Sequence, residues 1–416
     1  MDSISALTHR RLVLGQQGLW PGRRFEGLRG VSSAIRQMGA LQLDPLNIVA
    51  RSQDIALYSR VLDYKSSMLY KAAYERRRFF DYGGALFLYP MEELPFWRAI
   101  MGRVAASPRM RHFRENHPGA MDEVLAVLRT NGPMSNRDFE GSSLGYWSYR
   151  GRKDSAVALF YLWLLGEVMI TRRKGFDRVY DLRERVAPSE HDRIAPVDEA
   201  EQFFALKAIA WMNVMREKRF RIGWQDLIAG KVTDEDAQRM LESLVEAGKV
   251  VRTRIEGSKE TWITLSEYLP AIEALEAGRI PKAWKPRGPT TQEEVTLLAP
   301  LEVVSARGRA KQLFGFEYIW EVYKPVHLRR WGYYTLPVLY GDDLVARLDP
   351  RLDRQTGTLQ ILGFWMEEDA PRDEAFASAL GRGLARFAQM AGAQKLDVSA
   401  IQPRKLRLQV KKLSAF

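Results

Sequence analysis

Helix-like and strand-like hydrophobic patterns follow one another twice in the first two thirds of the chain. Within 164–175 an apolar helical run ends at Gly166, continues as a strand and turns at a second glycine, after which 179–182 runs back. Residues 245–257 repeat this order, with 261–265 as the returning strand. Glycine readily adopts the left-handed conformation that ends a helix or closes a tight turn. Both segments are therefore predicted to be a helix followed by a two-stranded hairpin.

A pair of helical segments precedes each hairpin. We expect them at 122–130 with 154–165, and at 200–217 and 224–229 with 234–247. In the first pair Ser135 is the predicted N-cap of a short helical segment through Phe139, since serine side chains accept from the free N–H groups of a first turn. Helices followed by a basic hairpin are typical of a winged helix-turn-helix, in which a helix enters a DNA groove and the hairpin contacts phosphates.

The N-terminal region carries a weaker third copy. A helical run at 31–38 stops at Gly39, and apolar and polar residues alternate over 41–44 until Pro45 ends the strand. A second element is expected over 48–58.

The pattern changes after a linker at 278–289 that holds three prolines among basic residues. Short alternating runs separated by turns then predict a β-rich unit with one helix at 373–391. We therefore expect an α+β chain of tandem winged helix-turn-helix domains followed by a β-rich domain. The predicted domains are 1–118, 119–195 and 196–277, each a winged helix, and 278–416, the linker and C-terminal domain.

Composition narrows the possible chemistry. The 416 residues are 46 % hydrophobic, which excludes disorder as the main state. There is no cysteine and the five histidines are scattered singly, so disulfides, thiol nucleophiles and cysteine-ligated zinc are excluded and no metal site is predicted. The longest apolar stretch, 157–170, contains Glu167 and is too short to span a bilayer. With no export signal in the first residues, we expect a soluble, cytoplasmic protein.

The basic excess lies at the two ends of the chain. Residues 1–80 hold 13 basic and 6 acidic residues, and 401–416 hold 5 basic and none acidic, which together account for the net charge of +12. A surplus placed in this way suits a polyanion, through phosphate contacts and counterion release. A charged surface that only maintains solubility is the alternative.

One polar pair could carry hydrolytic chemistry. Residues two apart on a strand face the same way, so the Gln42 amide and the Asp44 carboxylate would project together while Leu41 and Leu43 are buried. An amide can orient a water molecule whose proton the neighbouring carboxylate accepts. The alternative, which is the commoner arrangement, is that Asp44 starts a turn with Pro45 and that Gln42 is an ordinary solvated residue.

Two blocks of sequence resemble one family. Residues 39–60, GALQLDPLNIVARSQDIALYSR, are similar to the signature region of the crosslink-repair DNA glycosylases of the YcaQ and AlkZ type, and 330–349, RWGYYTLPVLYGDDLVARLD, are similar to their C-terminal block. The resemblance implies a C-shaped enzyme of tandem winged helices closed by a β-barrel-like domain. It also implies excision of N7-substituted guanines and unhooking of interstrand crosslinks.

The family's Gln-x-Gln or Gln-x-Asp motif falls on Gln42 and Asp44. The resemblance makes them the catalytic pair of a monofunctional glycosylase that needs no cofactor and acts on double-stranded DNA with alkylated or crosslinked guanine. Arg51, with Arg172 and Arg254 on the two hairpins, are the candidate DNA contacts, and a salt bridge within the fold is the alternative for Arg51. Residues 82–87, Tyr-Gly-Gly-Ala-Leu-Phe, depart from the Tyr-Trp-x-His run of many YcaQ-type members.

Two other functions stay open. A winged-helix regulator would bind DNA without catalysis, and fold and charge do not separate it from an enzyme. A β-lyase that forms a lysine Schiff base is less well supported, because no lysine follows the motif before Lys65.

Overall fold

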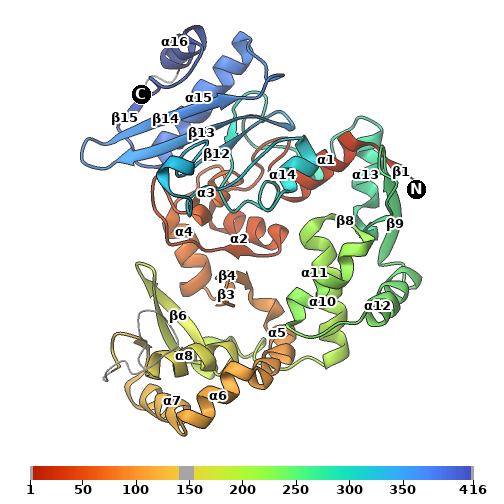
Figure 1. Ribbon diagram of the computed structural model, residues 1–416, viewed down its shortest axis with the longest axis vertical. Coiled ribbons are helices and arrows are strands. Elements are labelled where there is room, and N and C mark those ends of the chain that lie inside the picture. Colours follow the sequence, from red (N-terminus) through yellow and green to blue (C-terminus); the bar gives the residue numbers. More distant parts are fainter. Residues whose placement is uncertain (1–2, 140–153, 414–416) are drawn as a thin grey trace.

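The computed structural model describes residues 3–139 and 154–413 (Figure 1). Helices and short sheets alternate along the chain, so the α+β class is confirmed. Figure 1 shows the C-terminal sheet at one end of the long axis and helices α6–α8 with strand β6 at the other. Helices α10–α12 lie along one side, and α2–α4 lie between the two ends.

The N-terminal region forms helices around a three-stranded sheet, in the order β2-β4-β3. Its elements are α1 (Ala6–Gln16), α2 (Gly27–Met38), β2 (Leu41–Gln42), α3 (Ser52–Tyr58), α4 (Ser66–Tyr70), a π-helical turn (Lys71–Glu75), β3 (Phe79–Tyr82) and β4 (Phe87–Pro90). The helix at 31–38 is confirmed, and Gly39 ends it in the left-handed conformation with φ 77°. The expected strand through Asp44 is wrong in length, because the Asp44 N–H donates to the Gln53 side chain and Pro45 has no N–H to pair. Of the expected element 48–58, only the last seven residues are helical.

The second helical group ends in the first predicted hairpin. It contains α5 (Leu94–Met101), α6 (Pro108–Asn116), α7 (Ala120–Asn131), β5 (Met134–Ser135), α8 (Asp154–Leu164), β6 (Val168–Lys174), β7 (Asp177–Leu182) and α9 (Arg183–Val186), with sheet order β5-β7-β6. Gly166 and Gly175 both have positive φ, at 75° and 62°, as the sequence predicts. The helix expected after Ser135 is wrong over 136–139: Ser135 lies in β5 and donates from its N–H and hydroxyl to Asp138, which closes a turn. Residues 140–153 lie outside the described part.

The third group contains the second predicted hairpin. Its elements are α10 (Val197–Met212), β8 (Val214–Arg216), α11 (Phe220–Ile228), α12 (Asp234–Glu246), β9 (Val250–Ile255), β10 (Trp262–Leu265) and α13 (Leu269–Glu276). The helix expected to run to residue 217 ends at Met212, because Asn213 has φ 61° and the next three residues pair with β10. The N-terminal strand β1 (Ser3–Ile4) adds to this sheet in parallel with β9, a long-range pairing that the pattern did not predict.

The C-terminal region is β-rich, as expected. It contains β11 (Thr296–Leu297), α14 (Arg309–Phe314), β12 (Leu336–Tyr340), β13 (Asp343–Asp353), β14 (Thr358–Met366), α15 (Glu374–Met390), β15 (Lys395–Asp397) and α16 (Arg404–Leu413). The strands form one sheet in the order β11-β12-β13-β14-β15, and closure of that sheet into a barrel-like domain stays a prediction. Single 3-10 turns lie at Met91–Glu93, Gly102–Ala106, Glu217–Arg219, Ser266–Tyr268, Lys282–Trp284 and Val326–Leu328.

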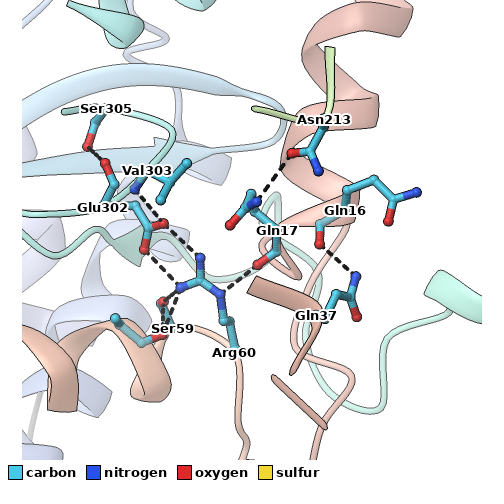
Figure 2. Close-up of polar contacts among 10 residues, drawn as sticks. Gln16, Gln17, Gln37, Ser59, Arg60, Asn213, Glu302, Val303 and Ser305 are labelled. Carbon is cyan, nitrogen blue, oxygen red and sulfur yellow. Dashed lines mark hydrogen bonds and ion pairs between the residues drawn. The ribbon is translucent and has the colours of Figure 1, made fainter. Parts of the chain in front are cut away.

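A buried ion pair fixes the C-terminal end of α3 against the C-terminal region (Figure 2). Arg60 and Glu302 are 242 residues apart, and Arg60 Nη2 lies 2.8 Å from Glu302 Oε1. Both side chains are almost fully buried. Arg60 also donates to the carbonyl oxygens of Gln17 and Ala56, so it joins α1, α3 and the segment before α14. A buried guanidinium needs this many acceptors, because it loses its water hydrogen bonds on folding.

Candidate functional site

Gln42 occupies the last position of β2, opposite Phe87 of β4. Its neighbours Leu41 and Leu43 are buried in the core, and Gln42 itself is partly exposed, which is the alternation that the sequence predicts. The Gln42 Nε2 amide donates to the carbonyl oxygen of Ala85, 3.2 Å away. The amide is therefore oriented by the main chain of the adjacent hairpin turn.

That turn is the segment in which the sequence departs from many YcaQ-type proteins. The Leu43 N–H donates to the carbonyl oxygen of Leu86 at 2.7 Å, and Leu86 has φ 59°. With the bond from Gln42 to Ala85, two main-chain carbonyls of this turn hold the motif strand. The departure therefore lies directly beside the candidate site.

Asp44 lies beyond the strand, where the chain turns. Its N–H donates to Gln53 Oε1 of α3 at 2.9 Å, and its Oδ1 accepts from the Leu46 N–H at 2.8 Å. The residue is only 9 % exposed. Burial raises the pKa of the Asp44 carboxyl above its usual value, and the hydrogen bond from Leu46 opposes that rise. The carboxylate thus closes a turn, as the alternative interpretation predicts, and it is also held in a largely desolvated position.

The loop that carries Asp44 is held by the C-terminal region. Arg354, in the turn between β13 and β14, donates from Nη2 to the carbonyl oxygen of Asn47 at 3.0 Å and to that of Val49 at 3.3 Å. The Leu352 N–H donates to the carbonyl oxygen of Ile48 at 3.3 Å. Nothing in the local sequence distinguishes Arg354 from other turn arginines, and sequence reasoning missed it.

Tyr334 makes a further contact with this loop. Its hydroxyl donates to the carbonyl oxygen of Ala50 at 3.1 Å. Burial raises the pKa of the Tyr334 hydroxyl, and the negative charges of Asp44 and Asp54 raise it further. The two sequence blocks that carry the family resemblance therefore meet at the candidate site.

Arg51 lies immediately before α3, at its N-cap position. Its guanidinium lies 5.6 Å from the centroid of the Phe176 ring, at the tip of the β6–β7 hairpin, and Arg173 lies 4.5 Å from the same ring. Within the described part of the chain, the buried Arg51 Nε has no hydrogen-bond partner. The structure thus places Arg51 against an aromatic ring, and both the phosphate contact and the salt bridge expected from sequence stay untested.

The hairpin is anchored to the N-terminal sheet by a buried ion pair. Arg173 Nη2 lies 2.7 Å from Asp81 Oδ2 of β3, and the Tyr74 hydroxyl donates to the same oxygen at 3.0 Å. Because Arg173 holds β6 against β3, the hairpin tip stays beside Arg51. The DNA contact predicted from the sequence is the neighbouring Arg172. It precedes Arg173 on β6 and is partly buried.

Arg254 lies elsewhere. It is exposed on β9 and pairs in register with Ser3 of β1. Figure 1 shows β9 and β1 at the right edge of the molecule and β6 on the left. The structure therefore brings Arg51 and Arg172 to the same hairpin region and leaves Arg254 apart from them.

The third group does not present a basic helix. The first turn of α12 consists of Asp234, Glu235 and Asp236, of which Asp236 forms a capping box with Thr233. Negative charge at this end suits the helix dipole but repels phosphate. An open cavity of about 810 Å³ lies between α11 and α12, and its lining holds both basic and acidic side chains, Arg103, Lys231, Arg239, Glu201 and Asp236, but neither Gln42 nor Asp44.

Within 3–139 and 154–413, no three histidine or acidic side chains are grouped so that they could hold a metal ion. Across the same residues, no helix is long and apolar enough to cross a membrane.

Comparison with known proteins relates the chain to a family and to a solved structure. Residues 35–390 match the family described as DNA glycosylase AlkZ-like. Among solved structures, the chain is similar to the Streptomyces sahachiroi DNA glycosylase AlkZ, with a TM-score of 0.60 and 12 % sequence identity over 95 % of this chain and 99 % of that one. The family match includes Gln42, Asp44 and the 330–349 block, and the structural likeness at this identity is a likeness of fold.

Proposed function

The chain belongs to the AlkZ-like DNA glycosylase family, and from that premise we propose that it hydrolyses the N-glycosidic bond of N7-alkylated guanines in duplex DNA and unhooks crosslinks formed there. The observation that carries the proposal is the position of Asp44. This buried carboxylate lies two residues after Gln42, on a loop held by the C-terminal region. Desolvation strengthens its interaction with a developing positive charge.

Alkylation at N7 gives the guanine a positive charge, so the purine leaves as a neutral base and needs no general acid. The bond between C1′ and N9 breaks with its electron pair going to the purine, and the sugar becomes oxocarbenium-like. Asp44 stabilises that cation and accepts the proton of the water that attacks C1′, and Gln42 orients the water. The water oxygen forms the new bond to C1′, which leaves an abasic site.

We further propose that the enzyme is monofunctional, because a β-lyase needs an amine at the sugar and no lysine lies between the motif and Lys65. Tandem winged helices and a barrel-like C-terminal domain are the architecture that we propose for DNA binding. Arg51 and Arg172 are the proposed contacts to the DNA backbone beside the lesion, and Arg254 is a proposed contact on another face.

A specific observation favours the second candidate, a DNA-binding regulator without catalysis. Asp44 Oδ1 already accepts a hydrogen bond from the Leu46 N–H, which is a sufficient structural reason for an aspartate before Pro45. The two functions differ in whether DNA is cut after treatment with alkali.

The test uses duplex DNA with a single N7-methylguanine, and alkali-labile abasic sites are counted. Wild-type protein is expected to form them, and Asp44→Asn is expected to lose excision while it still binds the duplex. Asp63→Asn is a matched control, since Asp63 is exposed in the same region. Full excision by Asp44→Asn would remove Asp44 from the mechanism, and binding without excision by the wild type would favour the regulator.

A further inference from the structure

The segment 319–329, named here the apolar loop, exposes an unusual set of side chains. Across the described residues, the two most exposed large hydrophobic side chains are Tyr323 at 86 % and Val326 at 76 %. Ile319 and Leu328 of the same segment are also exposed. Single exposed apolar residues are ordinary, but a contiguous group marks a binding surface.

The apolar loop has a fixed conformation. The buried carboxylate of Glu321 accepts from Lys324 Nζ at 2.8 Å, from the Arg330 N–H at 2.8 Å and from the Trp331 N–H at 2.7 Å. Arg329 Nε donates back to the Lys324 carbonyl oxygen at 2.9 Å. Because these bonds order the loop before any partner arrives, its apolar side chains can bind with little further loss of entropy.

The apolar loop adjoins the candidate site. The Trp320 ring lies 6.1 Å from that of Tyr323 and 6.3 Å from that of Tyr334, centroid to centroid. Tyr334 in turn contacts Ala50 on the Asp44 loop. The apolar loop is therefore connected to the Asp44 loop through the rings of Trp320 and Tyr334.

The apolar loop also carries basic residues, Lys324 and Arg329, and Arg330 follows it directly. The Arg329 guanidinium lies 4.7 Å from the centroid of the Tyr333 ring. Of the nearby carboxylates, Glu321 is buried against Lys324, and the exposed Glu317 is paired with Arg330 at 2.9 Å. Apolar side chains accompanied by arginine are the combination with which proteins wedge a DNA base step, and the connection of this loop to the Asp44 loop makes DNA the occupant that we argue for.

We propose that the apolar loop is a DNA-binding wedge: Tyr323, Val326 and Leu328 press against the bases and sugars next to the lesion and unstack that step, while Arg329 contacts a neighbouring phosphate. The proposal rests on the proposed function, since it takes the substrate duplex to lie at Asp44. Apolar wedges of this kind partly unstack a base step and bend the duplex.

The test replaces all three side chains, in Tyr323→Ser/Val326→Ser/Leu328→Ser. The control, Ile194→Ser/Val197→Ser/Ile280→Ser, removes three exposed apolar side chains outside the loop. Affinity for a lesion-containing duplex is measured by fluorescence anisotropy, and unstacking by the fluorescence of 2-aminopurine placed beside the lesion. We expect the loop variant to bind about tenfold more weakly and to lose the 2-aminopurine signal, and the control to match the wild type. Unchanged melting of both variants would show that the fold is intact.

Asp44→Asn separates this proposal from the proposed function. This variant should keep wild-type affinity and unstacking, because binding precedes chemistry. If the wild-type protein itself shows no excision, the proposed function is overturned, but affinity and 2-aminopurine fluorescence still test the wedge. Wild-type affinity and 2-aminopurine signal in the loop variant would overturn the wedge. That outcome would instead indicate a surface for a protein partner.

Discussion

The hydroxyl of Tyr334 donates a hydrogen bond to the carbonyl oxygen of Ala50, 3.1 Å away, across 284 residues of sequence. Ala50 belongs to the loop that carries Asp44, and Tyr334 belongs to the segment that leads into β12. A contact to a main-chain oxygen positions the loop without depending on the identity of its side chains. The C-terminal region therefore contributes to the geometry of the candidate site as well as to the core.

Removal of that hydroxyl should loosen the loop while the ring stays packed. We expect Tyr334→Phe to lower the free energy of unfolding by about 1 kcal/mol, the usual net value of one hydrogen bond. We expect the single-turnover rate of excision to fall several-fold and DNA affinity to stay unchanged, because Asp44 moves relative to the sugar. A variant with a wild-type rate would show that the loop needs no support from Tyr334.

Arg354 should matter more, since it donates to two carbonyl oxygens of the same loop. Arg354→Ala is expected to lower the excision rate about tenfold, and Arg354→Lys to restore only part of it, because an ammonium group cannot reproduce the planar guanidinium. Arg372→Ala is the matched control, an exposed arginine of the same region. Equal losses of excision rate in Arg354→Ala and Arg372→Ala would mean that the rate depends on net positive charge and not on the position of the Asp44 loop.

The raised pKa of Asp44 predicts a pH dependence. A protonated carboxyl can neither accept a proton nor stabilise a cation, so excision should fall as the pH drops through the Asp44 pKa. Because burial raises that pKa, the fall should begin at a higher pH than for an ordinary carboxyl. Single-turnover rates between pH 4 and pH 8 measure it. A rate independent of pH across this range would contradict the assigned role.

The raised pKa of Asp44 also affects stability. Ionisation of Asp44 favours excision but disfavours the folded state. When folding raises the pKa of a carboxyl, the folded protein holds that proton more tightly than the unfolded chain does. Above the raised pKa the carboxyl is ionised in both states, and its ionised form lowers the free energy of unfolding. Asp44→Asn should therefore be at least as stable as the wild type at pH 7.5, even though we expect it to lose excision. Chemical denaturation of both proteins at that pH provides the comparison.

The helix ends and hairpin turns could be predicted from sequence, because they depend on the conformational freedom of single glycines. Gly166 with Gly175, and Gly248 with Gly257, each adopt the positive φ that their hairpins require, so helix ends and turns were read correctly. The segment of Gln42 and Asp44 was found from the family resemblance, since the spacing alone favoured an ordinary turn. That turn exists, with Asp44 accepting from Leu46.

Long-range contacts explain what the sequence did not reveal. The helix expected to reach residue 217 is broken at Asn213, whose side chain accepts from Gln17 of α1 at 3.2 Å and whose carbonyl accepts from Thr264 at 2.7 Å. Arg354 acts through a loop some 300 residues earlier. Such partners are set by the tertiary fold, and no local spacing records them.

The buried pair of Arg60 and Glu302 should be sensitive to loss of one partner. Glu302→Leu leaves the guanidinium of Arg60 buried with fewer acceptors, and we expect it to lower the free energy of unfolding by about 3–5 kcal/mol. The double variant Arg60→Leu/Glu302→Leu should recover much of that loss, because no unpaired charge remains. Urea denaturation of the wild type, of Glu302→Leu, of Arg60→Leu and of the double variant measures the coupling, and a double variant as unstable as the sum of the two single variants would argue against it.

His9 of α1 should make stability depend on pH below neutrality. The ring is 5 % exposed and lies edge-on to Trp262 at 5.4 Å between centroids, and burial together with the charge of Arg309 lowers the pKa of His9 to about 3. The unfolded chain binds a proton near pH 6.5, whereas the folded chain does not until about pH 3, so stability falls as the pH drops from 6.5 towards 3. At pH 5.5 the expected loss is on the order of 1 kcal/mol.

His9→Phe should remove that contribution, since phenylalanine fills the site beside Trp262 and does not titrate. The difference between wild type and variant in the free energy of unfolding, measured at pH 7.5 and pH 5.5, isolates His9 from the other titrating groups. His191→Gln is the control, because His191 is only partly buried, and this variant should keep the pH dependence of stability of the wild type. If the wild type and His9→Phe lose the same stability between the two pH values, His9 is protonated within the fold and the burial argument is wrong.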